Sequence, residues 1–144
     1  MPIADDVRDE FFGRPWVAVL SVAADDGRPP LTVPVFYAYE GGLITFFTGT
    51  QGRKARKTKL IARAGQVSVC VQLPELPFQT ITAECTVVDA DRAPTTGQVL
   101  AVVRRYVPEE AAREFATGET DPPSGTFVLF TARPDRWLSA GFDD

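Results

Sequence analysis

Apolar and polar residues alternate along several short runs of the chain, and this period of two predicts a protein built mainly from β-strands. The clearest run is 66–73, in which every second residue is Val or Leu. Other runs are rich in β-branched and aromatic residues and are bounded by turn-forming Gly, Pro or Asp. The expected strands are 16–22, 31–39, 43–48, 66–73, 78–89, 126–132 and 136–140. Pro34 inside the second strand predicts an edge, a bulge or an unpaired position there.

Helical spacing of apolar residues appears in four segments, namely 4–12, 53–63, 96–106 and 109–115. Short loops rich in Gly, Pro and Thr are expected at 49–52, 74–77 and 118–124. The resulting order, β-β-β-α-β-β-α-β, is typical of an antiparallel barrel with helices outside and not of a doubly wound sheet. We therefore predict one mainly β domain over residues 1–144, with six or seven antiparallel strands.

The composition is that of an ordinary globular domain, with 144 residues, 44% hydrophobic and 24% charged. No apolar run approaches the roughly 18 residues that a membrane helix needs, so we predict no membrane contact. The N-terminal residues are acidic rather than apolar, which argues against a secretory signal. We expect a cytoplasmic protein.

The chain contains no histidine, which excludes histidine-based catalytic triads, histidine zinc sites and histidine-ligated haem iron. Its two cysteines, Cys70 and Cys85, are too few for a cysteine-rich metal centre, and no metal site is predicted. If the strands 66–73 and 78–89 form a hairpin, Cys70 lies opposite about Ile81. A disulfide between the two cysteines is therefore not expected.

The charge is unevenly distributed along the chain. Six Lys and Arg residues and no acid lie between positions 51 and 64, although the whole chain has a net charge of −4. This stretch follows the predicted strand that ends at Thr48, and it begins with Arg53 and Lys54. A helix start offers free N–H groups to an anion, and the two cations add charge-assisted donors, which indicates a phosphate site. The alternative is a solvated basic helix face. The spacing is not that of a P-loop.

The order of these motifs resembles the pyridoxamine 5′-phosphate oxidase-like, FMN-binding split-barrel superfamily over about residues 14–88. The segments that carry the resemblance are Val17-Ala18-Val19-Leu20-Ser21-Val22, Asp26-Gly27-Arg28-Pro29, Thr32-Val33-Pro34-Val35-Phe36, Phe46-Phe47-Thr48, Gly52-Arg53-Lys54-Ala55 and Gln66-Val67-Ser68-Val69. Their order and spacing together are more specific than any one of them.

The resemblance implies a homodimer of split barrels with a flavin in each of two clefts at the interface. It assigns the flavin phosphate to Arg53 and Lys54, near the strand-end Thr48. It places the isoalloxazine ring along the strand that contains Thr32, Pro34 and Val35. It also implies a contact with the ring or ribityl chain from Gln79 across the dimer. Lys57, from the cluster of cations, is a candidate for contact with the ligand phosphate or tail, with a solvated helix face as the alternative. Trp137 is a candidate to cover a flavin face from the partner subunit. For Trp137 the alternative is packing in the core or at an interface.

The chain departs from true pyridoxamine 5′-phosphate oxidases at several positions. Gly52 replaces a Ser, Thr32 replaces a phosphate-binding Arg, and Glu84 replaces a Gly in the later strand. The substrate motif Arg-Leu-His is absent. Pyridoxine phosphate is therefore not expected as a substrate. The cofactor choice stays open between FMN and the deazaflavin F420, whose acidic tail could meet the additional cations after Lys54.

These features predict an FMN- or F420-dependent oxidoreductase that acts on a small organic molecule. No side chain is an evident general acid, base or nucleophile, as expected where the cofactor carries the hydride chemistry. The alternative is a protein that binds a flavin, a deazaflavin or another small anion without turnover. Nucleic-acid binding through residues 53–63 is disfavoured, because the net charge is negative and the segment lacks interleaved aromatic residues.

Overall fold

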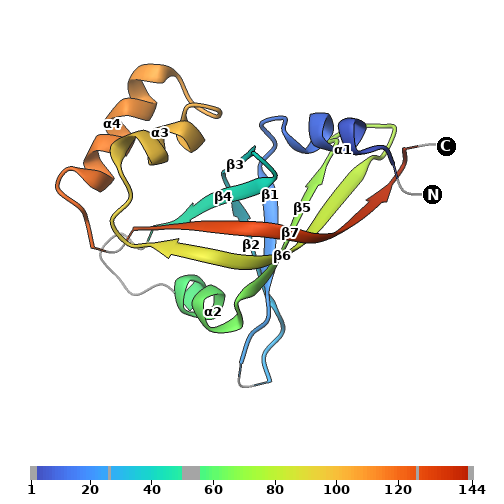
Figure 1. The fold of residues 1–144 in the computed structure, drawn as a ribbon, viewed down its shortest axis with the longest axis horizontal. Helices are drawn as coiled ribbons and strands as arrows, with labels where there is room; N and C mark the ends of the chain where they lie inside the picture. Colours follow the sequence, from blue (N-terminus) through green and yellow to red (C-terminus); the bar gives the residue numbers. More distant parts are fainter. Residues whose placement is uncertain (1–2, 26, 50–55, 126, 143–144) are drawn as a thin grey trace.

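The computed structural model describes residues 3–25, 27–49, 56–125 and 127–142, which form a seven-stranded sheet with four helices around it (Figure 1). The strands are β1 (Ala18–Val22), β2 (Leu31–Val35), β3 (Tyr37–Glu40), β4 (Leu43–Thr48), β5 (Gln66–Gln72), β6 (Thr80–Asp91) and β7 (Val128–Ala140). The helices are α1 (Asp5–Phe12), α2 (Arg56–Ala64), α3 (Thr96–Val103) and α4 (Glu109–Thr120).

The sheet is antiparallel throughout, and its strands follow the order β2-β1-β5-β6-β7-β4-β3. Its two edge strands, β2 and β3, are consecutive in the sequence and are separated only by Phe36. Val35 and Tyr37 can therefore lie no more than about 7 Å apart. The sheet has to curl until its two edges meet, and this forms the predicted antiparallel barrel, open along one side.

The same connection corrects the prediction of one strand over residues 31–39. The chain leaves β2 at Val35 and enters β3 at Tyr37, and the two strands pair with different partners. Pro34 does lie on an edge strand, as predicted. It pairs with Val19 of β1, and its missing N–H costs the sheet nothing on the unpaired side.

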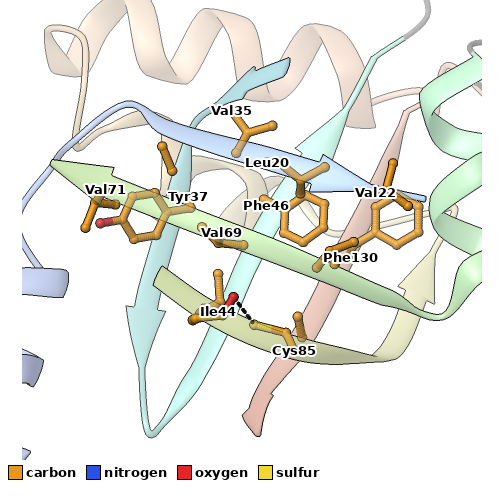
Figure 2. Packing of buried hydrophobic residues seen from close by; sticks show 14 of the residues in the cluster. Leu20, Val22, Val35, Tyr37, Ile44, Phe46, Val69, Val71, Cys85 and Phe130 are labelled. Atoms are coloured by element: carbon orange, nitrogen blue, oxygen red, sulfur yellow. Dashed lines mark hydrogen bonds between the residues drawn. The ribbon is translucent and has the colours of Figure 1, made fainter. Parts of the chain in front are cut away.

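Side chains from all seven strands point into the curled sheet and form one apolar core (Figure 2). The alternation predicted for residues 66–73 is confirmed, because Val67, Val69 and Val71 of β5 are buried while their neighbours face outward. Helices close the core on two sides. Phe11 and Phe12 of α1 and Leu60 and Ile61 of α2 are all buried in it.

Strand β7 is one strand of 13 residues and not the two strands, 126–132 and 136–140, that the sequence predicts. In the structure, Pro134 faces Cys85 beside a register shift in the pairing of β6 with β7. A bulge accepts a residue without an N–H, so the strand continues past the proline.

The hairpin of β5 and β6 confirms that both cysteines are free. Cys70 lies opposite Thr82, one residue from the predicted Ile81, and Cys85 lies opposite Val67. Burial raises the pKa of the Cys85 thiol to about 12. Cys85 is therefore a neutral core residue at physiological pH.

Helices α3 and α4 form a hairpin between β6 and β7, to one side of the barrel (Figure 1). The hairpin has a small core of its own, in which Val99, Val103 and Ala112 pack against Phe127. Helix α4 runs to Thr120, which is further than the predicted 109–115, and shortens the loop expected at 118–124. None of the helices in the described ranges is long and apolar enough to cross a membrane.

Candidate cofactor site

A cavity of about 330 Å³ opens between the end of β2, the end of β4 and the start of α2. The residues that line it are Val17, Pro34, Val35, Phe36, Phe47, Gly49 and Lys57. Three of the residues that the sequence assigns to a cofactor, namely Pro34, Val35 and Lys57, thus meet at one place. Whether they bind a cofactor there stays a prediction.

Aromatic rings form one wall of this cavity. Phe36 and Phe47 meet edge to face, with ring centroids 6.5 Å apart and planes at 86°. The ring of Phe47 stacks in turn on Phe127, at 4.8 Å, and contacts Phe115 of α4 at 5.7 Å. This wall suits a planar, apolar group, because offset and edge contacts between rings stabilise such an arrangement.

Lys57 is the one charged residue among the described residues that line the cavity. The other lining side chains are apolar, and Gly49 contributes only its backbone. An apolar cavity with a single cation at its rim favours a ligand with a flat ring and an anionic group. No carboxylate, thiol or phenol lines it within the described part of the chain, so Lys57 is the one lining side chain there that could transfer a proton.

Helix α2 is held against the end of β4 by a hydrogen bond between two threonines. The hydroxyls of Thr48 and Thr58 lie 2.7 Å apart, and both residues are buried. Thr48 is only 1% exposed and does not line the cavity. In this structure its hydroxyl positions the basic helix, and the cofactor contact expected for it stays a prediction.

Arg56, the first residue of α2, carries a guanidinium nitrogen that is buried without a hydrogen-bond partner among the described residues. Such an unpaired donor is costly, since buried polar groups almost always have a partner. An anion bound at the start of α2 would satisfy it. The remaining cations of the helix differ from Arg56, because Lys59 is exposed and Arg63 forms an ion pair with Asp25.

Arg53 and Lys54, the predicted phosphate ligands, lie outside the described residues together with Thr50 and Gly52. Their role stays a sequence-based prediction. Thr32 lies on β2 two residues before Pro34 and is exposed, with its hydroxyl 3.5 Å from that of Ser21. It does not line the cavity.

Gln79 and Trp137 do not line this cavity of their own protomer. Gln79 precedes the first residue of β6, where Thr80 pairs with Ala140 at the end of β7. The contact of both residues with a cofactor across a dimer stays a prediction.

Trp137 has packing partners of its own. Its ring meets Phe12 edge to face at 5.1 Å and Tyr39 at 5.9 Å, and the Arg8 guanidinium lies 4.5 Å above it. These contacts support the alternative of a packing role. The side chain of Gln79 donates a hydrogen bond of 3.4 Å to the Gly141 carbonyl oxygen.

A larger cavity, of about 470 Å³, lies elsewhere on the sheet and contains none of the predicted site residues. Ser21, Ser68, Glu84 and Arg136 are among its lining residues. Glu84 lies 4.0 Å from Arg136, and both side chains are largely exposed. This cavity is an open polar groove with weakly paired charges, and nothing in it resembles the ring-and-anion arrangement of the smaller one.

Sequence reasoning assigned no site role to Phe36 or Phe47, because both belong to apolar runs that read as buried strands. Both are in fact only half-buried, since each side chain also faces the cavity. A signal was available for Phe47. In the predicted strand 43–48 it falls on the face opposite to Ile44 and Phe46, so an apolar residue there needs a partner outside the core.

Neither a protein-family model nor a curated protein matches the chain. Solved structures match over almost its whole length. An F420 reductase has a TM-score of 0.71 at 22% sequence identity, with 96% of this chain and 98% of that chain covered. HutZ, the haem storage protein of Vibrio cholerae, has a TM-score of 0.70 at 17% identity, with 96% and 95% covered. A FAD-binding protein of Mesorhizobium loti has a TM-score of 0.62 at 18% identity, with 95% and 94% covered.

The likeness covers 95–96% of this chain, although the functions named for the three proteins differ. The chain therefore has the fold of these proteins, an antiparallel split barrel.

Proposed function

We propose that this chain binds a flavin or a deazaflavin, FMN or F420, in the cavity between β2, β4 and α2. The observation that carries the proposal is the convergence of Pro34, Val35 and Lys57 on one apolar cavity with an aromatic wall. Residues assigned from separate sequence motifs meet there. The Arg56 guanidinium nitrogen, which has no partner among the described residues, fits the same ligand, since a phosphate at the start of α2 would give it one.

In this proposal the ring lies against Phe36 and Phe47, with the backbone of Pro34 and Val35 along one edge. The phosphate lies at the start of α2, where Arg53, Lys54 and Lys57 supply positive charge. A bound flavin or deazaflavin supplies hydride transfer, and the chain supplies binding, orientation and exclusion of water. The apolar lining serves the last of these roles, because it offers water few hydrogen-bond partners.

We further propose that the chain is an oxidoreductase acting on a small organic molecule, and that it works as a homodimer. The dimer would supply Gln79 and Trp137 to a cavity whose lining in their own protomer does not include them. The reaction is one that fits a split barrel of the same fold as an F420 reductase.

Binding without turnover is the second candidate function. It is favoured by the lack of a carboxylate, thiol or phenol among the described residues that line the cavity, and by the likeness to a haem storage protein. Haem held through histidine is excluded for this chain, which has none. A flavin or deazaflavin carrier would have the same cavity and the same cations as the enzyme.

One experiment separates the two candidates. The purified protein is titrated with FMN and with F420, followed by cofactor fluorescence, and the bound cofactor is then reduced and mixed anaerobically with a panel of small acceptors. Oxidation of the bound cofactor by an acceptor faster than that of the free cofactor supports the enzyme. Tight binding without any such acceleration favours the carrier, and binding of neither cofactor contradicts the whole proposal.

A further inference from the structure

Tyr106, in the turn between α3 and α4, reaches across to the barrel with its hydroxyl. The hydroxyl accepts a hydrogen bond of 3.1 Å from the Tyr37 N–H. It also lies 2.7 Å from the Trp16 carbonyl oxygen and 3.0 Å from the Tyr37 carbonyl oxygen, to which it donates. Burial raises the pKa of Tyr106, so the hydroxyl keeps its proton and remains a donor.

The ring of Tyr106 lies flat on the ring of Phe36. The two centroids are 4.1 Å apart, and the planes are only 6° from parallel. Phe36 is the residue between β2 and β3, and it lines the candidate cofactor site. Tyr106 therefore holds both the side chain of Phe36 and the backbone of the residue that follows it.

The hydroxyl also reaches the second segment of the cavity wall. Trp16, whose carbonyl oxygen it contacts, immediately precedes Val17, which lines the same cavity. Arg105, the neighbour of Tyr106, strengthens this attachment, because its guanidinium donates hydrogen bonds to the carbonyl oxygens of Gly13 and Arg14. The turn of the helical hairpin is thus fixed to the two backbone segments that carry Val17 and Phe36.

The bend at Phe36 has no glycine or proline of its own to set its geometry. Its shape has to come from contacts made elsewhere in the fold, and Tyr106 supplies a hydrogen bond and a stacked ring at that one residue. A change at Tyr106 should therefore move the aromatic wall while leaving the sheet and α2 in place.

We infer that Tyr106 is a positioning residue, which sets the orientation of Phe36 and so couples the α3–α4 hairpin to binding of the cofactor ring. The inference rests on the proposed function, in that the cavity takes the ring of a flavin or deazaflavin. It concerns the ring and not the phosphate, because Tyr106 contacts Phe36, Trp16 and Tyr37 rather than the basic helix α2.

The test compares Tyr106→Phe, which keeps the ring and removes the hydroxyl, with the wild-type protein. Affinity is measured for FMN and for riboflavin, which has the ring without the phosphate. We expect both affinities to fall by the same factor, roughly five- to tenfold for the loss of one buried hydrogen bond. The absorption band of the bound flavin should also shift, since the surroundings of its ring change.

Thr95→Ala is the matched control. Thr95 caps the start of α3 through a reciprocal pair of hydrogen bonds with Gln98, and it belongs to the same helical hairpin. Loss of this helix cap should lower the melting temperature about as much as Tyr106→Phe does. It should leave the affinity for flavin and the spectrum of the bound flavin unchanged. Equal weakening of flavin binding by Thr95→Ala would overturn the inference, as would wild-type affinity in Tyr106→Phe.

Hydrogen exchange at the Tyr37 amide gives a readout that does not depend on any cofactor. We expect protection in the wild type and in Thr95→Ala, and faster exchange in Tyr106→Phe, because its hydroxyl acceptor is gone. Unchanged exchange would overturn the inference by itself. A wild-type protein that binds neither FMN nor F420 would overturn the proposed function, while the amide would still decide whether Tyr106 positions the wall.

Discussion

The hydroxyls of Thr48 and Thr58 meet at 2.7 Å, and this hydrogen bond joins the end of β4 to the first turns of α2. Both threonines are buried, at 1% and 7% exposure, so neither hydroxyl can turn to water if the other is removed. The pair thus fixes where the basic helix starts relative to the cavity. It links the apolar and the cationic halves of the candidate cofactor site.

The first prediction concerns the stability of this pair. Thr48→Val and Thr58→Val should each lower the free energy of unfolding by about 1–3 kcal/mol, because each leaves a buried hydroxyl without its partner. The double variant should cost clearly less than the sum of the two, since it leaves no unpaired group. Urea denaturation of the four proteins measures this, and strictly additive losses would show that the hydrogen bond is not formed.

The second prediction separates the phosphate from the ring. Lys57→Met removes the one charge among the described residues that line the cavity and keeps much of the side-chain volume. FMN should bind at least about tenfold more weakly, the usual effect of losing a charge-assisted contact, while riboflavin should bind as before. Lys59→Met is the control, because Lys59 is exposed on the same helix. Equal loss of FMN affinity in both variants would indicate a general effect of helix charge.

The third prediction tests the homodimer. Gln79 does not line the cavity of its own protomer, and in the proposed homodimer a complete site should combine Lys57 of one protomer with Gln79 of its partner. Homodimers of Lys57→Met and of Gln79→Ala should both bind FMN weakly. A mixed dimer of the two should recover one wild-type site, and therefore half of the binding capacity at wild-type affinity.

The mixed dimer is made by co-expression with two affinity tags and is titrated with FMN. If both residues served the same protomer's site, every site in the mixed dimer would carry one substitution. No tight binding would then be recovered, and the interface proposal would be wrong.

The fourth prediction concerns alkaline pH. Folding raises the pKa of the Cys85 thiol from an ordinary value of 9.0 to about 12 through burial, so the folded state holds its proton more tightly than the unfolded state does. This contribution to stability is complete below about pH 8.5 and is lost as the pH rises toward 12. Tyr39, whose pKa is also raised to about 12, acts in the same direction at higher pH.

Thermal unfolding between pH 8 and pH 11 checks this. The stability of the wild-type protein should fall over that range, and the fall should be shallower in Cys85→Ala, which has lost one of the groups. A steeper pH dependence in Cys85→Ala would contradict the raised pKa of the Cys85 thiol.

Thiol labelling gives a second check. In the native protein a thiol reagent should modify the half-buried Cys70 before Cys85.

The sequence predicted those elements whose bounds follow from the local pattern of apolar and polar residues. It did not predict those whose bounds are set by how the whole sheet curls. Strands with one buried face, such as β5, were predictable because alternation reports burial directly. The division at Phe36 was not, since the break arises from the curling of the whole sheet, and Pro34 two residues earlier indicated only an edge, a bulge or an unpaired position. The continuous strand β7 was also missed, because a bulge in its pairing with β6 accommodates Pro134.

The site was predictable where a motif carried it. Lys57 followed from the cluster of cations, and Pro34 and Val35 followed from the family resemblance, and the structure brings all three to one cavity. Phe36, Phe47 and Tyr106 could not be found this way. An aromatic residue facing a cavity and one facing the core give the same sequence signal, and Tyr106 acts from a helical hairpin about 70 residues away along the chain.

The most direct test of the account is calorimetric titration of the wild-type protein and of the Arg53→Ala/Lys54→Ala double variant with FMN and with F420. We predict that the wild type binds one of the two cofactors tightly, with one site per protomer. The double variant should lose at least about a hundredfold in affinity, because each lost charge-assisted contact contributes roughly 1.5–3 kcal/mol. Binding of neither cofactor by the wild type, or equal affinity in the variant, would contradict a cofactor phosphate at the start of α2.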